Sequence, residues 1–551
     1  MKSSIAPLSF LHGSAPSIQQ SVSRPRIATW ALLAWCMMFI PSSIQAAADL
    51  YMKDTPADTG TEPNPDAGPM YVTQDIWVRQ NPISGYQPYA FVADPAWLTA
   101  VSPLHQNPEY RDPKYSKPNY VYVRVRNRGS TASAGTERLR VYWAKASTGL
   151  SWPSQWVDYL AANCGPTKLY GMEITKPRRN LADTSIPQAE VDEYRDAIVA
   201  IGTLAGYQFP DSVSYWHKQQ SVHSHVVTYT EPAFAAHGND GFLPWHREFL
   251  QRYEILLREA YPKVTLFYWD WTTDPSLSAR ITGAMGSFSG GAIGAPFNVL
   301  FPPTISRFIG TAPTAPTPTA TTDATVTAPA TFSGHSSANE SPHNRSHVFV
   351  GGSGGTLTSP STSTRDPFFF LLHGNADRLG AMWQRKNPNR YDPATTYSGS
   401  SATMTEPMAP WNGLRYNGSS ASVGNPVNSI SPWTAADGYI TLKRADDHSV
   451  VFPPIYDTAP LTIPPLAAGE SVVIEIPWYP PNPADFSCFG PDQGHVCLLA
   501  RIETSTSSPY GMTFPEGAGV GTNFAASCPP ERPRAGSNDR HARWRSACRP
   551  D

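Results

Sequence analysis

Histidine is concentrated in one part of this chain. Nine of the fourteen histidines lie between residues 217 and 373, in segments whose hydrophobic residues recur at helical spacing. One histidine on the apolar face of a helix is ordinarily a core residue. Several on separate helices constrain the fold far more, because a buried imidazole without a partner is costly and a metal is one partner that they can share. The nine are His217, His223, His225, His237, His246, His335, His343, His347 and His373.

Local patterns place these histidines on helices. Pro244 fits the first turn of a helix, where its missing N–H costs nothing. His246 and Phe249 follow at helical spacing, which predicts that His246 points inward. His343 and His347 are four residues apart, so they share one face of a helical turn.

Two further helices are expected to carry histidines. His373 leads one of them in "DPFFFLLHGNADRLGAMWQR", with Asp377 one turn on. His223 lies near the end of "DSVSYWHKQQSVH", whose helix Asp211 or Ser212 would cap.

The predicted site is rich in nitrogen and poor in carboxylates. Imidazole ligands suit copper, zinc, iron or nickel. A hydrolytic dizinc site would include carboxylates at ligand spacing, and "HNRSH" lacks the Glu of the H-E-x-x-H metalloprotease helix. A 2-His-1-carboxylate iron site would leave too many histidines unused. The residue types therefore favour copper.

Three segments carry a specific resemblance. "AAHGNDGFLPWHREFLQRYE", "SPHNRSHVFVGG" and "DPFFFLLHGNADRLGAMWQR" resemble the two copper signatures of the type-3 copper family, which comprises tyrosinases, catechol oxidases and hemocyanins. The resemblance covers about residues 170–395. It implies a mainly α, tyrosinase-like four-helix bundle that binds two copper ions, each through three histidines.

The resemblance also implies which histidines bind copper. His223 is selected for the first position of copper A by "WHKQQSVH", with His217 and His225 as alternatives. His335 is expected in a polar loop and not among the ligands. The implied ligands are His223, His237 and His246 for copper A, and His343, His347 and His373 for copper B.

Other positions match or depart from the family pattern. Arg247 and Asp377 match a basic and an acidic position whose pairing would brace the ligand helices; the alternative is a surface salt bridge. Ala235 replaces a cysteine that many members cross-link to a ligand histidine, so we expect no thioether bond there. Leu372 stands where many members have a second histidine directly before the ligand at His373, and Gly380 replaces a tryptophan at a helical position, where glycine costs about 1 kcal/mol relative to alanine; neither change removes a copper ligand.

The family chemistry is the oxidation of phenols by O2 at the copper pair. Asn344 matches the family position that helps to hold a proton-accepting water, and the proton matters because the pKa of a phenol is about 10. The resemblance implies an acidic partner four residues before His343, where Asn339 stands; Glu340 is one residue further on. The segments 311–331 and 351–365 are low in complexity and predicted to be loops that pack no core. The second segment contains no aromatic residue, which predicts an open pocket at copper B for phenols of varied size.

Strand-like segments flank the helical region. "NYVYVRVRNRGSTASAGTERLRVYWA" predicts two strands, with Val121, Val123 and Val125 on one face. "ESVVIEIPW" and "HVCLLARIET" predict two more near the C-terminus, and together these segments resemble a CARDB-like, immunoglobulin-type module. We expect the helical domain to be inserted into one split β-sandwich, with Trp156 and Gly438 close together.

The predicted fold is therefore multidomain α + β: a tyrosinase-like four-helix-bundle dicopper domain plus an immunoglobulin-like β-sandwich. The β domain is expected to bind a surface or to shield the active site. The predicted parts are a signal peptide over 1–48, the first sandwich half over 49–156, the dicopper domain over 157–430, the second sandwich half over 431–516, and an Arg/Pro-rich disordered tail over 517–551.

Composition limits the partners and the compartment. Lys+Arg at 42 against Asp+Glu at 44 gives a formal charge of −2, which offers no general attraction for nucleic acid or an anionic membrane. The first 48 residues lack Asp and Glu and contain a short apolar run followed by "PSSIQAAAD". This pattern predicts a secretory signal peptide, with an N-terminal membrane anchor as the alternative, and hence a periplasmic or extracellular protein without an integral membrane span. In that compartment Cys488 and Cys497 could close a hairpin, although their positions alone do not fix the disulfide pairing.

The sequence predicts a copper phenol oxidase and leaves alternatives open. Its substrates would be monophenols that are hydroxylated at the ortho position, o-diphenols that are oxidised to o-quinones, or both. One alternative is a catechol oxidase only, and another is a hemocyanin-like protein that binds O2. A third is that the β-sandwich is the working part, as an adhesion or carbohydrate-binding module.

Overall fold

The structure is a computed structural model. It describes residues 48–53, 55–61, 73–83, 105–114, 118–146, 150, 152–160, 164–165, 168–209, 212–227, 236–300, 305–312, 321–387, 390, 454–505 and 524–527. Residues 1–47 of the predicted signal peptide, residues 517–523 and 528–551 of the predicted tail, Ala235 and Gly438 lie outside these residues. The expected proximity of Trp156 and Gly438 therefore stays a prediction. Within the tail predicted to be disordered, Phe524–Ser527 form strand β13, which pairs with β12 (Val496–Glu503), so the prediction is wrong for these four residues.

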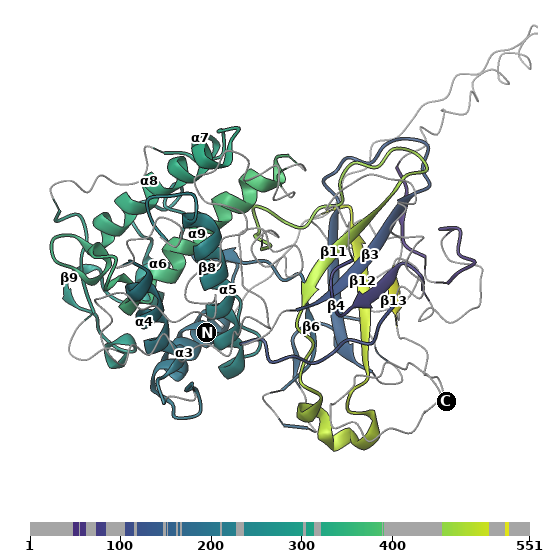
Figure 1. The fold of residues 1–551 in the computed structure, drawn as a ribbon, viewed down its shortest axis with the longest axis horizontal. Helices are drawn as coiled ribbons and strands as arrows, with labels where there is room; N and C mark the ends of the chain where they lie inside the picture. The colour runs from purple at the N-terminus through teal and green to yellow at the C-terminus, as the bar shows by residue number, and fades with distance from the viewer. Residues whose placement is uncertain are drawn as a thin grey trace, which may run out of the picture. The chain divides into compact units, whose positions relative to one another are not determined.

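Helices, among them those that carry the histidines, build the middle of the described chain (Figure 1). They pack on one another around a single hydrophobic core that holds aromatic residues such as Trp216, Phe249 and Phe370. The helices are α3 (Gln188–Thr203), α4 (Tyr215–Val227), α5 (Phe242–Ala260), α6 (Ala279–Met285), α7 (Asp323–Val326), α8 (Phe332–Gly351) and α9 (Phe368–Arg385).

The predicted helices form where the local signals place them. Pro244 occupies the first turn of α5, and Thr331 caps α8 by accepting a hydrogen bond from the N–H of Gly334. Asp211 or Ser212 was expected to cap α4; Asp211 lies outside the described residues, and the Ser214 hydroxyl accepts from the N–H of His217 at the start of this helix. Two short sheets and three 3-10 helices complete this part: β7 (Arg179–Asn180) with β8 (Phe267–Tyr268), β9 (Ser289–Ala292) with β10 (Ser306–Phe308), η2 (Phe297–Val299), η4 (Thr356–Thr358) and η5 (Ser363–Arg365).

Strands from both sides of the helical region pair with each other. In the first sheet β11 runs antiparallel to β3, with Val473 opposite Arg124. In the second sheet β12 runs antiparallel to β4, with Ala500 opposite Val141. The first sheet contains β1 (Leu50–Tyr51), β2 (Ile76–Arg79), β3 (Asn119–Asn127) and β11 (Ser471–Trp478); the second contains β4 (Arg138–Lys145), β5 (Tyr159–Leu160), β6 (Leu169–Glu173), β12 (Val496–Glu503) and β13 (Phe524–Ser527).

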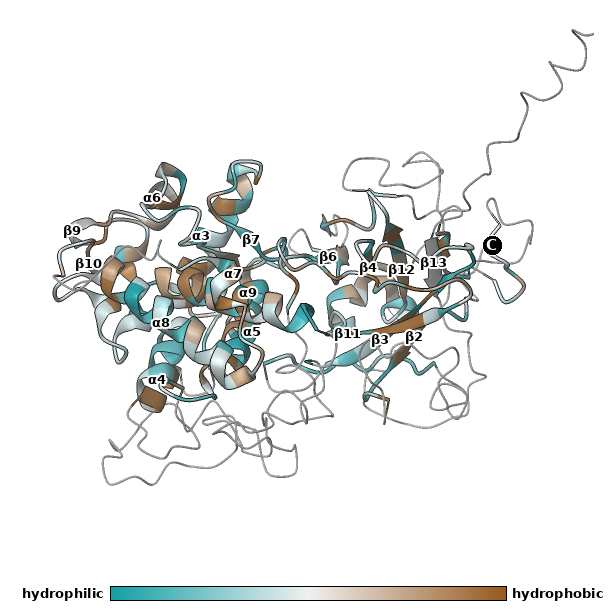
Figure 2. Cartoon of the chain, turned by 90° about the horizontal axis from the view of Figure 1, so that it is seen from above, coloured by the Kyte–Doolittle hydropathy of each residue, from teal (hydrophilic) through white to brown (hydrophobic). Residues whose placement is uncertain are grey.

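The two sheets share one hydrophobic core. Val121, Val123 and Val125 of β3 are buried in it, as their predicted common face requires, together with Ile474 of β11 and Leu498 of β12. Figure 2 shows the hydrophobic residues of β4 and β12. The strand pairing establishes a β structure built from distant segments, and its immunoglobulin type remains a prediction.

The β structure extends beyond the predicted boundary at residue 156. Strand β6 pairs with β4, so that Met172 lies opposite Trp143 in the second sheet. The prediction ended the first β zone too early, because β6 is only five residues long and has little alternation of its own. Its place in the sheet depends on its partner strand.

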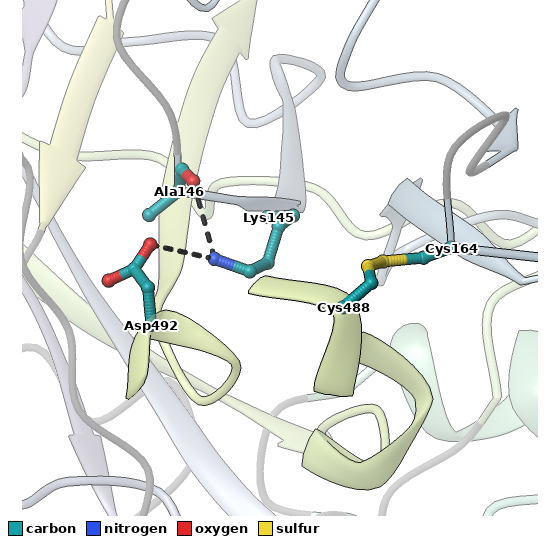
Figure 3. The surroundings of a disulfide bond; sticks show 5 residues. All are labelled: Lys145, Ala146, Cys164, Cys488 and Asp492. Atoms are coloured by element: carbon teal, nitrogen blue, oxygen red, sulfur yellow. Dashed lines mark hydrogen bonds and ion pairs between the residues drawn. A yellow bond between two sulfur atoms is a disulfide. The ribbon is translucent and has the colours of Figure 1, made fainter. Parts of the chain in front are cut away.

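The predicted disulfide between Cys488 and Cys497 is wrong. Cys164 pairs with Cys488 over a sequence separation of 324 residues, with their Cα atoms 5.7 Å apart (Figure 3). Cys497 is disulfide-bonded too, and its place in β12 separates it from Cys488, which lies in the 3-10 segment η9 (Pro483–Asp492). Beside this bond the Lys145 ammonium lies 3.2 Å from the Asp492 carboxylate.

The segment 351–365 is irregular but not loosely packed, contrary to the prediction. Leu357 and Thr364 are fully buried. The Thr364 hydroxyl donates to the side-chain oxygen of Gln220, and the Thr358 hydroxyl donates to the backbone oxygen of Gly352. Small hydroxyl side chains can enter the interior when each finds a partner of this kind, which composition alone does not reveal. In the other low-complexity segment, 311–331, the described residues include the short helix α7.

Candidate dinuclear metal site

Six histidines come together from four helices and one loop. Helix α4 carries His223, the loop before α5 carries His237, and α5 itself carries His246. Within the described residues, the groups of His, Cys, Asp or Glu with metal-ligand spacing are two sets of three, and neither set contains a carboxylate. The sets are His223, His237 and His246, and His343, His347 and His373.

The set His343, His347 and His373 has three nitrogens that point at one position. The Nε2 atoms of His343 and His373 are 3.0 Å apart, and that of His347 lies 3.1 Å from each of them. Neutral imidazoles have one lone pair each, so three converging Nε2 lone pairs repel unless a cation lies between them. This donor set fits a copper ion.

The nitrogens of His223, His237 and His246 are more widely spaced than those of the other set, and three of them likewise lack hydrogen-bond partners among the described residues. The ligand nitrogens of these three residues lie within 4.8 Å of one another. Among the described residues, both ring nitrogens of His223 and Nε2 of His246 are buried and find no hydrogen-bond partner. Buried polar atoms are normally satisfied, so these orphaned nitrogens are consistent with a metal at their centre.

Hydrogen bonds to the opposite ring nitrogen orient the Nε2 atoms. Nδ1 of His246 lies 2.8 Å from the backbone oxygen of Phe242, and Nδ1 of His347 lies 3.0 Å from that of Leu357. Nδ1 of His343 lies 3.0 Å from the side-chain oxygen of Asn344. An acceptor at Nδ1 holds the proton there and leaves the Nε2 lone pair for a metal, as in other histidine-ligated centres.

Burial keeps these imidazoles neutral. Desolvation lowers the pKa of His237 to about 4 and that of His347 to about 3. The pKa values of His223, His246 and His373 also lie well below the ordinary value, chiefly through desolvation and then through the neighbouring histidines. At neutral pH the six rings are therefore in the form that binds a metal.

The two sets adjoin each other. The rings of His246 and His373 stack with centroids 4.2 Å apart, and each of these residues belongs to a different set. The ring centroids of His223 and His373 are 6.4 Å apart. Two metal ions held by these sets would be close neighbours, which is the arrangement of a dinuclear site.

Two phenylalanines, which the sequence analysis did not single out, pack between the histidines. The ring of Phe369 lies 3.9 Å from that of His373 and 4.9 Å from that of His223, centroid to centroid. The ring of Phe242 lies 4.9 Å from that of His246. Both are fully buried, so they fix the imidazole rings and keep water from behind them. Each stands four residues before a histidine of its own helix, and this spacing was a usable signal.

Arg247 and Asp377 form a buried ion pair, which excludes the surface alternative. Nε of Arg247 lies 2.6 Å from a carboxylate oxygen of Asp377, and both residues are buried. Arg247 follows His246 in α5, and Asp377 is one turn after His373 in α9. The pair therefore joins a helix of each histidine set. Gly380 makes room for it, because a Cβ at this position would lie 3.2 Å from Nη2 of Arg247.

The Asp377 carboxylate also binds groups that sequence reasoning did not identify. Nη1 of Arg178 donates to it over 3.1 Å and the hydroxyl of Tyr456 over 2.9 Å. Arg178 is held in turn by Glu254 of α5, over 2.7 Å. Tyr456 lies 79 residues beyond Asp377, so no local pattern could have connected them.

The remaining candidates take different places. His217 contacts Ser214 through Nδ1 and belongs to neither set, while the side chain of His225 is outside the described part. His335 was expected in a loop but lies in α8. Its buried ring stacks on that of Trp383, with the ring centroids 4.9 Å apart. It too belongs to neither set.

Asn344 and Glu340 line a cavity of about 840 Å³, together with Gly238, the residue after His237; none of the six histidines is among its lining residues. Glu340 accepts a hydrogen bond from the N–H of Gly238, and burial raises the pKa of its carboxyl. Asn339, at the position implied for the acidic partner, is buried and donates to the backbone oxygen of Ala376 instead. Residues 351–365 are not among those that line this cavity, so the open-pocket prediction cannot rest on their composition.

Comparison with known proteins gives a consistent result. The chain matches the model of the common central domain of tyrosinase over residues 213–299 and 304–386. It is 32% identical to the tyrosinase of Streptomyces antibioticus, over 32% of this chain and 74% of that protein. It is 28% identical to hemocyanin units G and H of Sepia officinalis, over 42% of each chain. A solved tyrosinase of Burkholderia thailandensis aligns with a TM-score of 0.33 and 16% identity, over 51% of this chain and 73% of that one.

Proposed function

Since this chain belongs to the tyrosinase family, and is thus an oxidoreductase that uses O2 at a dinuclear copper centre, we propose that it is an exported phenol oxidase. It would hydroxylate monophenols at the ortho position and oxidise o-diphenols to o-quinones. The observation that carries the proposal is the pair of adjoining, carboxylate-free histidine sets.

We assign copper A to His223, His237 and His246, and copper B to His343, His347 and His373. When bound, the copper pair supplies the activation of O2 and accepts electrons from the phenol. The chain supplies the geometry: each set is held by helices that pack on a common core, and Phe242 and Phe369 fix its rings. These rings also give the phenol a dry, aromatic surrounding.

Deprotonation of a phenol is the step for which the chain must provide an acceptor. A phenol has a pKa of about 10, so it enters protonated at neutral pH. Asn344 and Glu340 line the cavity beside His343, and the raised pKa of Glu340 makes its carboxylate a better proton acceptor than an ordinary glutamate. We propose that these two side chains hold a water that takes the phenol proton.

If Asn344 helps to hold the water that takes the phenol proton, replacing it should impair the hydroxylation of monophenols more than the oxidation of catechols. A catechol is the product-like substrate that needs no hydroxylation, so Asn344→Ala should lower kcat/KM for tyrosine about tenfold or more and affect its catechol analogue less. Copper content must be measured alongside, because Asn344 also contacts Nδ1 of His343. Equal losses on both substrates at full copper content would count against the role.

Export rests on the N-terminal sequence pattern. Residues 1–47 lie outside the described part of the chain. Among the described residues, helices of the length and hydrophobicity that a bilayer crossing requires are absent. Expression of the full chain, followed by N-terminal sequencing of the exported product, would test the predicted cleavage near Asp49; an uncleaved, membrane-bound chain would contradict it.

The similarity to hemocyanin units favours one other function, reversible O2 binding without turnover. One experiment separates the two and tests the whole proposal. The chain is loaded with copper, copper per chain is measured, and oxidation of tyrosine and of its catechol analogue is followed. Two copper ions per chain with catechol turnover support the oxidase. Turnover of the catechol but not of tyrosine would indicate a catechol oxidase only, and O2 binding without turnover of either would indicate a carrier.

A further inference from the structure

A cavity of about 190 Å³ lies where helices α5 and α9 face strand β11 and the segment after β6. Its lining includes Ile255 of α5, Arg385 of α9, Ile476 of β11 and Ile174, which follows β6. None of the six histidines is among its lining residues, so it is separate from the candidate copper site. The proposed function therefore does not account for it.

The walls of this cavity are mostly apolar, and most of its polar side chains are charged. Ile174, Ile255, Ile455 and Ile476 contribute apolar surface. The charged side chains are four cations and two carboxylates: Lys176, Arg178, Arg258 and Arg385, with Glu254 and Glu475. Cavities of this kind bind organic molecules, because the apolar walls bury the body of the ligand and a few polar groups fix its orientation.

Three of the four cations already have a carboxylate partner. A guanidinium nitrogen of Arg178 lies 2.7 Å from a carboxylate oxygen of Glu254, and one of Arg258 lies 3.2 Å from the other oxygen. The Lys176 ammonium lies 2.9 Å from the Asp158 carboxylate. These pairs compensate one another, so they leave the fourth cation, Arg385, to be considered by itself.

Arg385 is the last residue of α9, and most of its hydrogen-bond donors are unused. Its Nη1 donates to the backbone oxygen of Pro460 over 2.8 Å. Among the described residues, no carboxylate lies at ion-pair distance from this guanidinium, and its buried Nε has no hydrogen-bond partner. A cation is favourable at the C-terminal end of a helix, but that position does not use the five N–H donors of a guanidinium. An anion is therefore the partner that Arg385 lacks.

We propose that this cavity binds a small organic molecule that has one carboxylate and an apolar body. The carboxylate accepts hydrogen bonds from the guanidinium of Arg385, which matches it in shape and charge. The apolar body packs against Ile255 and Ile476. An inorganic anion would leave these walls uncovered, and a neutral apolar molecule would leave Arg385 without an anion.

The first test compares three ligands on the full chain, with and without copper, by isothermal titration calorimetry. Hexanoate should bind about tenfold or more tightly than hexan-1-ol, because hydrogen bonds to a charged group contribute most when both partners are charged. Hexanoate should also bind more tightly than acetate, since each additional buried methylene is worth up to about fourfold. Its Kd should be the same with and without copper.

Three results of this first test would overturn the inference. Equal affinity for acetate and hexanoate would show that the apolar walls take no part and that the guanidinium attracts an adventitious ion only. Equal affinity for hexan-1-ol and hexanoate would show that no cation binds the carboxylate. Binding of hexanoate to the copper-loaded chain alone would place it at the copper ions. None of these results depends on whether the chain oxidises phenols.

The second test uses variants of two adjacent residues. Arg385→Gln should weaken hexanoate binding about tenfold or more and leave hexan-1-ol binding unchanged. Lys386→Gln is the matched control, because Lys386 is the next residue, is exposed and does not line the cavity. It should keep the wild-type Kd for hexanoate. If Arg385→Gln binds hexanoate as tightly as wild type, or if Lys386→Gln weakens binding equally, the inference is wrong. If Arg385→Gln does not fold, the comparison of ligands on the wild-type chain decides by itself.

Discussion

Asp377→Asn tests whether the buried ion-pair network holds the two histidine sets together. Asp377 accepts from Arg247, Arg178 and Tyr456, and it is 2% exposed. The asparagine has the same size, but it removes the charge and turns one acceptor oxygen into an NH2 donor. A donor would then face the guanidinium of Arg178 or Arg247, and neither can accept.

The expected loss of stability in Asp377→Asn follows from the burial of the ion pairs that Asp377 makes. Breaking a buried ion pair by removing one partner costs about 3–5 kcal/mol, because the other charge stays buried with less compensation. Arg178 keeps Glu254, and Arg247 keeps a bond to Gln384 over 2.6 Å, so we expect the lower end, about 3 kcal/mol. The free energy of unfolding of a domain is roughly 5–15 kcal/mol, so this loss is a large share of the stability.

The measurement is urea unfolding of the copper-free chain, with copper per chain determined after reloading. Asp192→Asn is a matched control, since Asp192 pairs with Arg195 over 3.3 Å while its own side chain is 49% exposed. The control should lose at most about 1 kcal/mol. If Asp377→Asn unfolds at the same urea concentration as the control and retains both copper ions, the network does not brace the site.

Four further outcomes are expected. Removing copper with a chelator should lower Tm, and restoring copper at about a thousand times its Kd should recover about 4 kcal/mol; an unchanged Tm would argue against copper at these histidines. The copper-free chain should lose stability as the pH falls from 6.5 toward 4, by up to about 1.4 kcal/mol per pH unit for each buried histidine. The reason is that histidines of the unfolded chain bind protons in this range, whereas His237 and His347 of the folded chain stay neutral. A free energy of unfolding that does not change between these pH values would refute this. Phe369→Ala should cost about 3–5 kcal/mol and lower copper retention, whereas Phe369→Leu should cost less; calorimetry and metal analysis distinguish them. The double variant Cys164→Ser/Cys488→Ser should lose about 2–5 kcal/mol, seen as a lower midpoint of denaturant unfolding under non-reducing conditions, while an unchanged midpoint would show that strand pairing alone suffices.

Local patterns in the sequence predicted the helices that carry His223, His246, His343, His347 and His373, whereas the choice of the six ligands came from the resemblance to the type-3 copper signatures. Histidine spacing depends on residues three or four apart, and such residues lie on one helical face wherever the helix is placed. The alternation in β3 was equally local, and it gave the buried face of Val121, Val123 and Val125 correctly. These features need only short stretches of chain.

Only the tertiary structure showed which distant groups meet. Cys164 pairs with Cys488, and Tyr456 reaches Asp377, because separate segments pack side by side over separations of 324 and 79 residues. Composition also failed for residues 351–365, since Thr364 is buried through a bond to Gln220, which lies 144 residues earlier. The sequence by itself determined which residues could bind two metal ions. The packing of helices from distant parts of the chain decided that His246 and His373 stack and that Arg247 and Asp377 are buried, because these contacts form only when the whole core closes.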